Sequence, residues 1–239
     1  MTSSKGQVLM RAHGFPVDHF GVAVRDTRAG CDVMEALTGV RPYLTPPEPG
    51  QWYQSAGLAL GPDSFLEIIG PNPDHRGFHP LKAIVRDFEA PFVLFWYVAT
   101  DDFAAFRARV RKAGHRLERV EATPDDPGPE HSRYIRGVIG PGFTTNRPSV
   151  IEWKRKAHRA DMQDRCALID FQLAQPDPAP LKVLFQGLGI DLPVTSGRRR
   201  IAFKMDTPKG EVTLEGPGID GDLATMLGAA WRDFWRRQR

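Results

Sequence analysis

Three glutamates recur at equivalent places in this sequence, and carboxylates so placed can accept or release protons. Glu67 lies in SFLEIIG, Glu152 in SVIEW and Glu215 in VTLEG. Each motif closes a segment that opens with an apolar run ending in aspartate. The period of about 75 residues indicates a duplicated supersecondary unit and not a solenoid of short repeats. Paired units can bring equivalent positions, including Glu67 and Glu152, to one shared cavity.

Each segment is predicted to contain a strand, a helix and then further strands. The openings are DHFGVAVRD at 18–26, VLFWYVATDD at 93–102 and LIDFQLAQPD at 168–177. Their closing aspartates are typical helix N-caps, and FAAFRARVRKAG has apolar residues at helical spacing. We therefore predict an α+β fold of repeated βαβββ units. The stretch 71–88, with His75 and His79, is expected to be a connector that lies on the surface.

The repeats divide the chain into five parts. They are a leader at 1–16, a domain of two βαβββ units at 17–155, a linker at 156–165, a third βαβββ-like half-unit at 166–217 and an amphipathic C-terminal helix at 218–239. The C-terminal helix is basic, so it is expected to dock on its own domain or a partner chain, or to touch a membrane surface.

Composition excludes several classes of protein. The 239 residues are 41% hydrophobic with a net charge of +3, as in ordinary soluble domains. Neither a run long enough to span a bilayer nor a signal peptide is evident, so we expect a cytoplasmic protein without a membrane partner. Two cysteines form neither a disulfide framework nor a zinc cluster. Short arginine clusters occur without a nucleic-acid motif, so no nucleic-acid partner is expected.

The order of elements resembles the vicinal-oxygen-chelate superfamily. The opening DHFGVAVRDTRAG and the closing LALGPDSFLEIIGP are similar to its glyoxalase-like branch. FWYVATDDFAAFRARVRKAG and SVIEWKR are similar to the second half of that branch. The resemblance covers roughly 17–155 and implies two units that fold into an open, curved-sheet barrel, with the third half-unit and the C-terminal helix added.

The resemblance also implies a divalent metal held by a first-strand and a last-strand residue of each unit. Carried over, the ligands are His19, Glu67 and Glu152, and Glu67 or Glu152 is the candidate catalytic base. Phe95 or its neighbours occupy the fourth position, which removes a ligand. One imidazole and two carboxylates suit Zn, Ni, Mn or Mg at least as well as Fe.

Other interpretations of these residues remain open. His19 in an apolar strand is often a hydrogen-bonded core residue. Asp170 and Glu215 could form part of a site in the third half-unit, and His131 could supply the missing nitrogen from a loop. Each of these is an alternative to the three-ligand site.

Aromatic residues gather around the expected cavity and would suit a small organic ligand. The predicted ligand-binding residues are Trp52, Phe95, Tyr97, Trp153 and Arg133, and Arg136 is a second arginine that could orient an anion.

Two functions follow from the site, and a third from the extra half-unit. The first is a metal-dependent enzyme of the lyase, isomerase or dioxygenase type, with the ion as Lewis acid on a small oxygenated substrate. The alternative is a metal-free binding or resistance-type protein that sequesters a small aromatic or hydrophobic ligand. An unpaired third half-unit could also pack on a second chain, giving a homodimer.

Overall fold

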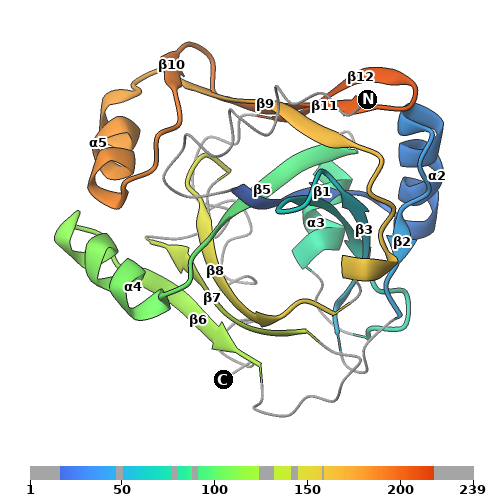
Figure 1. The fold of residues 1–239 in the computed structure, drawn as a ribbon, viewed down its shortest axis with the longest axis horizontal. Coiled ribbons are helices and arrows are strands. Elements are labelled where there is room, and N and C mark those ends of the chain that lie inside the picture. Colours follow the sequence, from blue (N-terminus) through green and yellow to red (C-terminus); the bar gives the residue numbers. More distant parts are fainter. Residues whose placement is uncertain are drawn as a thin grey trace.

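Strands dominate the molecule, and a few helices accompany them (Figure 1). The computed structural model describes residues 17–46, 51–76, 80–87, 91–123, 132–140, 145–157 and 159–217. The mixture of strands and helices confirms the predicted α+β class. The expected leader, the C-terminal helix, His79 and His131 lie outside the described residues. Within the described part of the chain, none of the helices has the length and apolar character to cross a bilayer.

The three segments each contain a strand, a helix and three more strands. The first has β1 (Val17–Ala23), α2 (Thr27–Thr38), β2 (Tyr43–Leu44), β3 (Tyr53–Ala59) and β4 (Phe65–Pro71). The second has β5 (Phe92–Ala99), α4 (Phe103–Lys112), β6 (Leu117–Ala122), β7 (Arg133–Ile139) and β8 (Ser149–Arg155). The third has β9 (Ala167–Gln175), α5 (Ala179–Leu188), β10 (Val194–Ser196), β11 (Arg200–Thr207) and β12 (Gly210–Pro217).

Two further elements lie in stretches predicted as connector and linker. They are α3 (Pro80–Asp87) and the short 3-10 helix η1 (Arg159–Asp161). The helix α3 was not predicted, although its residues Leu81, Ile84 and Val85 have helical spacing and are all buried.

An eight-stranded sheet joins the first two segments in the order β2-β3-β4-β1-β5-β8-β7-β6. β1 and β5 pair antiparallel at its centre. On its other side, β1 pairs in parallel with β4, the last strand of the first segment. In the same way, β5 pairs in parallel with β8, the last strand of the second segment. The two segments therefore present equivalent strands on either side of the β1–β5 pair.

The predicted aspartate caps start both helices that follow the central strands. Asp26 accepts a hydrogen bond from the backbone nitrogen of Ala29 (2.8 Å), and Asp102 accepts one from Ala105 (2.8 Å). Gly39 ends α2 with φ of 75°, a left-handed conformation that glycine adopts without strain. These caps fix where each helix leaves the sheet.

The third segment pairs its strands differently from the first two. Its four-stranded sheet has the order β10-β9-β11-β12. The first strand, β9, pairs in parallel with the second strand, β10, instead of with the last one. The third segment therefore has the same element order as the first two, but its sheet is not a copy of theirs.

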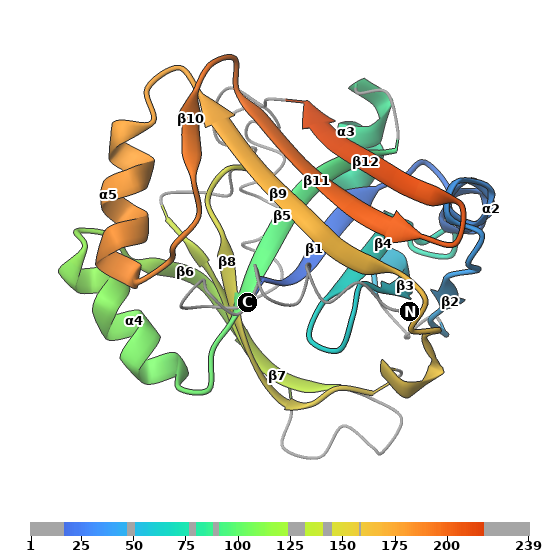
Figure 2. The same cartoon turned by 45° about the horizontal axis from the view of Figure 1, so that its top comes forward.

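The four-stranded sheet covers one face of the eight-stranded sheet, which we call the outer face (Figure 2). Phe20 of β1 stacks on Phe203 at 4.2 Å between ring centroids and meets Phe171 at 4.9 Å. Trp96 of β5 contacts Phe171 and Phe185 at 4.9 and 5.9 Å. The third segment thus buries its apolar side within the same chain, so this surface is not left open for a second chain.

Candidate functional site

The face opposite Phe20 carries the predicted first-strand ligand. Neighbouring residues of a strand point to opposite faces, so His19 and Gly21 belong to the other side, which we call the inner face. Strand register places Glu67 beside Gly21 on β4, and Phe95 beside Gly21 on β5. His19, Glu67 and Phe95 therefore converge on the inner face.

His19 lies between two aromatic rings that hold its orientation. The ring of Phe65 stacks on it at 4.7 Å between centroids and 22° between planes. The ring of Tyr97 stacks on the other side at 4.4 Å and 16°. The residue is only 5% exposed. The imidazole is therefore clamped, and each of its nitrogens has a defined direction.

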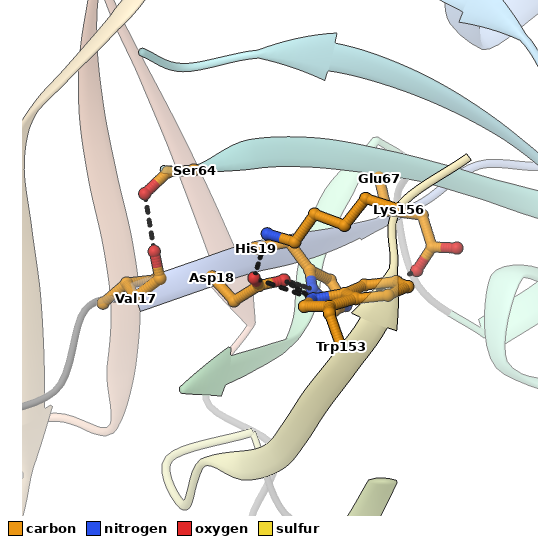
Figure 3. Close-up of polar contacts among 7 residues, drawn as sticks. All are labelled: Val17, Asp18, His19, Ser64, Glu67, Trp153 and Lys156. Atoms are coloured by element: carbon orange, nitrogen blue, oxygen red, sulfur yellow. Dashed lines mark hydrogen bonds and ion pairs between the residues drawn. The ribbon is translucent and has the colours of Figure 1, made fainter. Parts of the chain in front are cut away.

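Asp18 is a fully buried carboxylate on one side of His19 (Figure 3). It accepts hydrogen bonds from Nδ1 of His19 (2.8 Å), Nε1 of Trp153 (2.9 Å) and Nζ of Lys156 (2.6 Å). Burial raises the pKa of Asp18, but the hydrogen bond and the charge of His19, together with the charge of Lys156, outweigh burial and lower this pKa below its usual range. Asp18 is therefore ionised at neutral pH.

An ionised Asp18 decides which nitrogen of His19 carries the proton. A carboxylate can only accept, so Nδ1 is the donor, and Nε2 is left for a partner on the other side of the ring. Nε2 faces Oε2 of Glu67 at 3.9 Å, which is too long for a hydrogen bond. A ligand atom about 3 Å from both could contact Nε2 and the carboxylate together.

Glu67 is flanked by glycines on both neighbouring strands, Gly21 on β1 and Gly57 on β3. A Cβ atom at Gly21 would lie 2.1 Å from Cζ of Phe95, and one at Gly57 would lie 2.0 Å from Cε of Met162. The two glycines thus make room for an aromatic ring and a thioether. The Glu67 side chain, 22% exposed, has apolar groups on both sides.

Glu152 does not join His19 and Glu67. Its Oε2 accepts a hydrogen bond from the backbone nitrogen of Phe103 (2.8 Å) at the start of α4, and its other oxygen pairs with Lys154. The Lys154 hydrogen bond, with that from Phe103, lowers the pKa of Glu152 despite burial. The carboxylate caps a helix, so the structure does not bring it beside the other two predicted ligands.

The two helix caps show which residues of the central strands are equivalent. Asp26 follows β1 and Asp102 follows β5, each directly before its helix. Aligning these caps superposes Phe95 on His19, as the sequence predicted. Phe95 has no atom that can bind a metal ion.

The same alignment identifies the counterpart of Glu67. It superposes Tyr97 on Gly21, and register pairs Gly21 with Glu67 and Tyr97 with Ser149. Ser149 is therefore the structural counterpart of Glu67. Glu152 was predicted because both glutamates end a similar motif, but the strand register places Glu152 on the opposite face.

A guanidinium and a phenol lie beside this centre. Arg136 of β7 donates from Nε and Nη2 to Oε2 of Glu121 (2.9 and 2.7 Å), and its guanidinium lies 5.3 Å from the ring centroid of Tyr134. Burial opposes the charge of Arg136, but its neighbours, among them the Glu121 carboxylate, raise its pKa well above the usual range. Burial also raises the pKa of Tyr97, whose hydroxyl hydrogen-bonds Ser149, so its phenol is neutral.

The other predicted residues occupy separate places. Trp153 packs edge-on against Tyr134 (5.5 Å) and holds Asp18, while Trp52 packs on Tyr53 (5.0 Å) near α3. Arg133 is the first residue of β7, opposite Arg155 in the register.

The third segment does not form the alternative site. Asp170 accepts a hydrogen bond from Gln172 and Glu215 pairs with Arg200. Strand β11 lies between the two carboxylates' strands. His75, on the connector after β4, bonds through its backbone nitrogen to the carbonyl of Asn72 (3.2 Å).

Comparison with known proteins gives one family. Residues 17–188 match the family described as glyoxalase-like domain. The chain belongs to this family. It is therefore a member of the vicinal-oxygen-chelate superfamily, which confirms the resemblance predicted from the sequence. A search of curated proteins found no match.

Similar solved structures share little sequence with this glyoxalase-like chain. Methylmalonyl-CoA epimerase from Streptomyces coelicolor is 19% identical, with 57% of this chain and 92% of that chain covered and a TM-score of 0.42. The epimerase from Mycobacterium tuberculosis is 20% identical, with coverage of 61% and 91% and a TM-score of 0.42. A mutant 4-hydroxymandelate synthase from Streptomyces coelicolor is 17% identical, with coverage of 90% and 67% and a TM-score of 0.49.

The metal-ligating side chains on the inner face of this glyoxalase-like domain do not fit the expected divalent ion. Catalytic metal sites usually take three protein ligands. Here His19 offers only Nε2, because Nδ1 is bonded to Asp18, and Glu67 offers one carboxylate. Among the described residues, no group of three His, Cys, Asp or Glu side chains is placed to hold a metal ion.

Proposed function

We propose that this glyoxalase-like domain binds a small aromatic or apolar organic molecule on its inner face without a divalent metal. The observation that carries the proposal is the pair of counterpart positions, where Phe95 and Ser149 replace the second imidazole and the second carboxylate. The two ligands that the resemblance expects from β5 and β8 are therefore absent from those strands.

The chemistry of the inner face supports an aromatic or apolar ligand. Phe65, Phe95 and Tyr97 surround the imidazole, with Phe95 meeting His19 at 6.1 Å and Tyr97 at 5.7 Å between ring centroids. Apolar surroundings with a few placed polar groups are typical of small-molecule sites. Nε2 of His19 and the carboxylate of Glu67 would fix the orientation of the ligand.

A thermal-shift screen of small aromatic compounds in EDTA tests this proposal. A ligand at 100 times its Kd stabilises the fold by about 2.7 kcal/mol, which is readily detected. We expect Phe95→Ala and Glu67→Gln to weaken binding, and the exposed control Val183→Ala to leave it unchanged. Binding only when a divalent ion is added would favour the metal-dependent enzyme, whose support is the approach of His19 to Glu67.

A further inference from the structure

We infer that the linker at 156–165 closes the inner face, and that its Met162 side chain occupies the place where an apolar group of the ligand binds beside Glu67. The structure describes 156–157 and 159–165 of this linker. A ligand enters by displacing the Met162 thioether from Gly57. This inference rests on the proposed metal-free binding and deepens it, because it names the contact that regulates access to the same site.

The Met162 side chain lies on the inner face. Gly57 of β3 pairs with Glu67 of β4, and directly paired residues direct their side chains to the same face of a sheet. A Cβ atom at Gly57 would lie 2.0 Å from Cε and 2.8 Å from Sδ of Met162. The thioether therefore fills the side-chain position of Gly57, next to Glu67.

Tyr43 lies on the other side of this position. Gly57 pairs with Tyr43 of β2 as well as with Glu67 of β4, so the register puts both residues on the inner face with Gly57 between them. A glycine inside a strand often marks a place where another group approaches the backbone closely. The bare backbone of Gly57 leaves room for one apolar group, and Met162 supplies that group here.

The two glycines beside Glu67 differ in what fills their side-chain positions. The ring of Phe95 fills the position of Gly21, and Phe95 belongs to β5, which pairs with β1 on one side and β8 on the other. Met162 instead comes from the linker, and a methionine side chain turns about three bonds. Met162 can therefore leave its glycine, whereas Phe95 stays in place.

The linker is fastened on either side of Met162. Arg159 donates from Nη2 to the carbonyl of Gly61, and the backbone nitrogen of Leu168 bonds to the carbonyl of Leu60 (3.2 Å). Both carbonyls belong to the turn after β3, so the short helix η1 lies beside that strand (Figure 1 and Figure 2). Met162 itself is half-buried. Its thioether can move while the linker stays attached.

Lys156 covers the other polar group of the inner face. Its Nζ bonds to Asp18 (2.6 Å) and lies 5.9 Å from the ring centroid of Phe65, which stacks on His19 (Figure 3). With the thioether next to Glu67, the linker covers both groups that would orient a ligand. Access to them therefore depends on movement of the linker side chains.

Methyl NMR of protein labelled with 13C-methyl methionine tests the Met162 contact without a ligand. Met162→Leu assigns the signal. We expect Gly57→Ala to move this signal to the position of a solvent-exposed methionine, because the new Cβ takes the place of Cε and the backbone of Gly57 is not left-handed. The fully buried Met34 and Met205 should keep their signals.

The matched control for this substitution is Gly197→Ala. A Cβ atom there would lie 3.9 Å from Cβ of Ala174, which is an ordinary contact. Gly197→Ala should leave the Met162 signal unchanged.

Fluorescence titration with N-phenyl-1-naphthylamine, a neutral aromatic probe, measures access to the inner face in EDTA. We expect saturable binding of one molecule that becomes about 5–10-fold tighter in Met162→Ala and in Gly57→Ala, because burial of the thioether favours the closed form and only the open form binds. Gln163→Ala, an exposed neighbour in the linker, is the matched control and should keep the wild-type affinity.

Three outcomes overturn the inference, and they separate it from the proposed function. Wild type that binds the probe as tightly as Met162→Ala and Gly57→Ala refutes the closure by Met162 and leaves metal-free binding intact. A Met162 signal that does not move in Gly57→Ala refutes the closure as well. Failure of all of these proteins to bind the probe refutes the proposed binding and the inference together.

Discussion

Asp18→Asn is the substitution that should most disturb the inner face while changing its shape least. The carboxylate is fully buried and accepts from His19, Trp153 and Lys156. An amide keeps one acceptor oxygen but turns an NH2 group toward existing donors. The substitution loses charged hydrogen bonds and breaks a buried ion pair, which solvent screens in part because the Lys156 side chain is 30% exposed. The free energy of unfolding should therefore fall by about 2–4 kcal/mol at pH 7.

The pH dependence gives this prediction a second, sharper test. The pKa of Asp18 is lower in the folded than in the unfolded chain, where it is about 3.9. The charged form therefore stabilises the fold above that value, and the contribution is lost as pH falls through the folded pKa. Wild type and Asp18→Asn should differ fully at pH 7 and converge in strongly acidic solution.

Urea unfolding at a series of pH values measures both effects. The matched control is Asp32→Asn, an exposed aspartate paired with Arg41, which should change stability by about 0.5 kcal/mol or less. If Asp18→Asn behaves like the control at pH 7, or if its cost does not shrink in acid, the buried ionised carboxylate is not what holds His19.

Three further predictions address the neighbouring structure. Glu152→Gln should destabilise the fold by about 0.5–2 kcal/mol in urea unfolding, because Phe103 loses a charged partner at the start of α4, while inner-face ligand binding measured by calorimetry stays the same. Phe95→His combined with Ser149→Glu should create divalent-metal binding detectable by calorimetry, since it supplies the two counterpart ligands; no gain would refute the alignment of the halves. Phe203→Ala should cost about 3–5 kcal/mol in thermal unfolding, and a much smaller loss would mean that the four-stranded sheet packs only loosely on the outer face.

The fold was predictable where local signals and tertiary packing agree. Asp26 and Asp102 follow apolar runs directly and do cap helices, so the places of α2 and α4 could be taken from the sequence. The short helix α3 was missed because its three apolar residues sit in a stretch rich in proline and histidine. The sheet order of the third segment depends on packing against Phe20 and Trp96, which no local pattern records.

The candidate site likewise has residues that the sequence indicates and residues whose place depends on strand register and packing. His19 and Glu67 were predicted as site residues from motifs of the first segment, and the structure places Nε2 of His19 3.9 Å from Oε2 of Glu67. Glu152 was predicted beside them from its motif, but it lies an odd number of residues from Ser149 along β8, so its side chain is on the other face. Asp18 was overlooked although a charged residue inside an apolar strand needs a partner, and that signal pointed to the group that orients His19.

Metal content measured on untagged, purified protein tests the central claim most directly. Elemental analysis of wild type beside His19→Ala, followed by titration with Zn, Ni, Mn, Mg and Fe, should find no stoichiometric ion in either protein. A stoichiometric divalent ion in wild type that is lost in His19→Ala would contradict metal-free binding on the inner face and restore the metal-dependent enzyme.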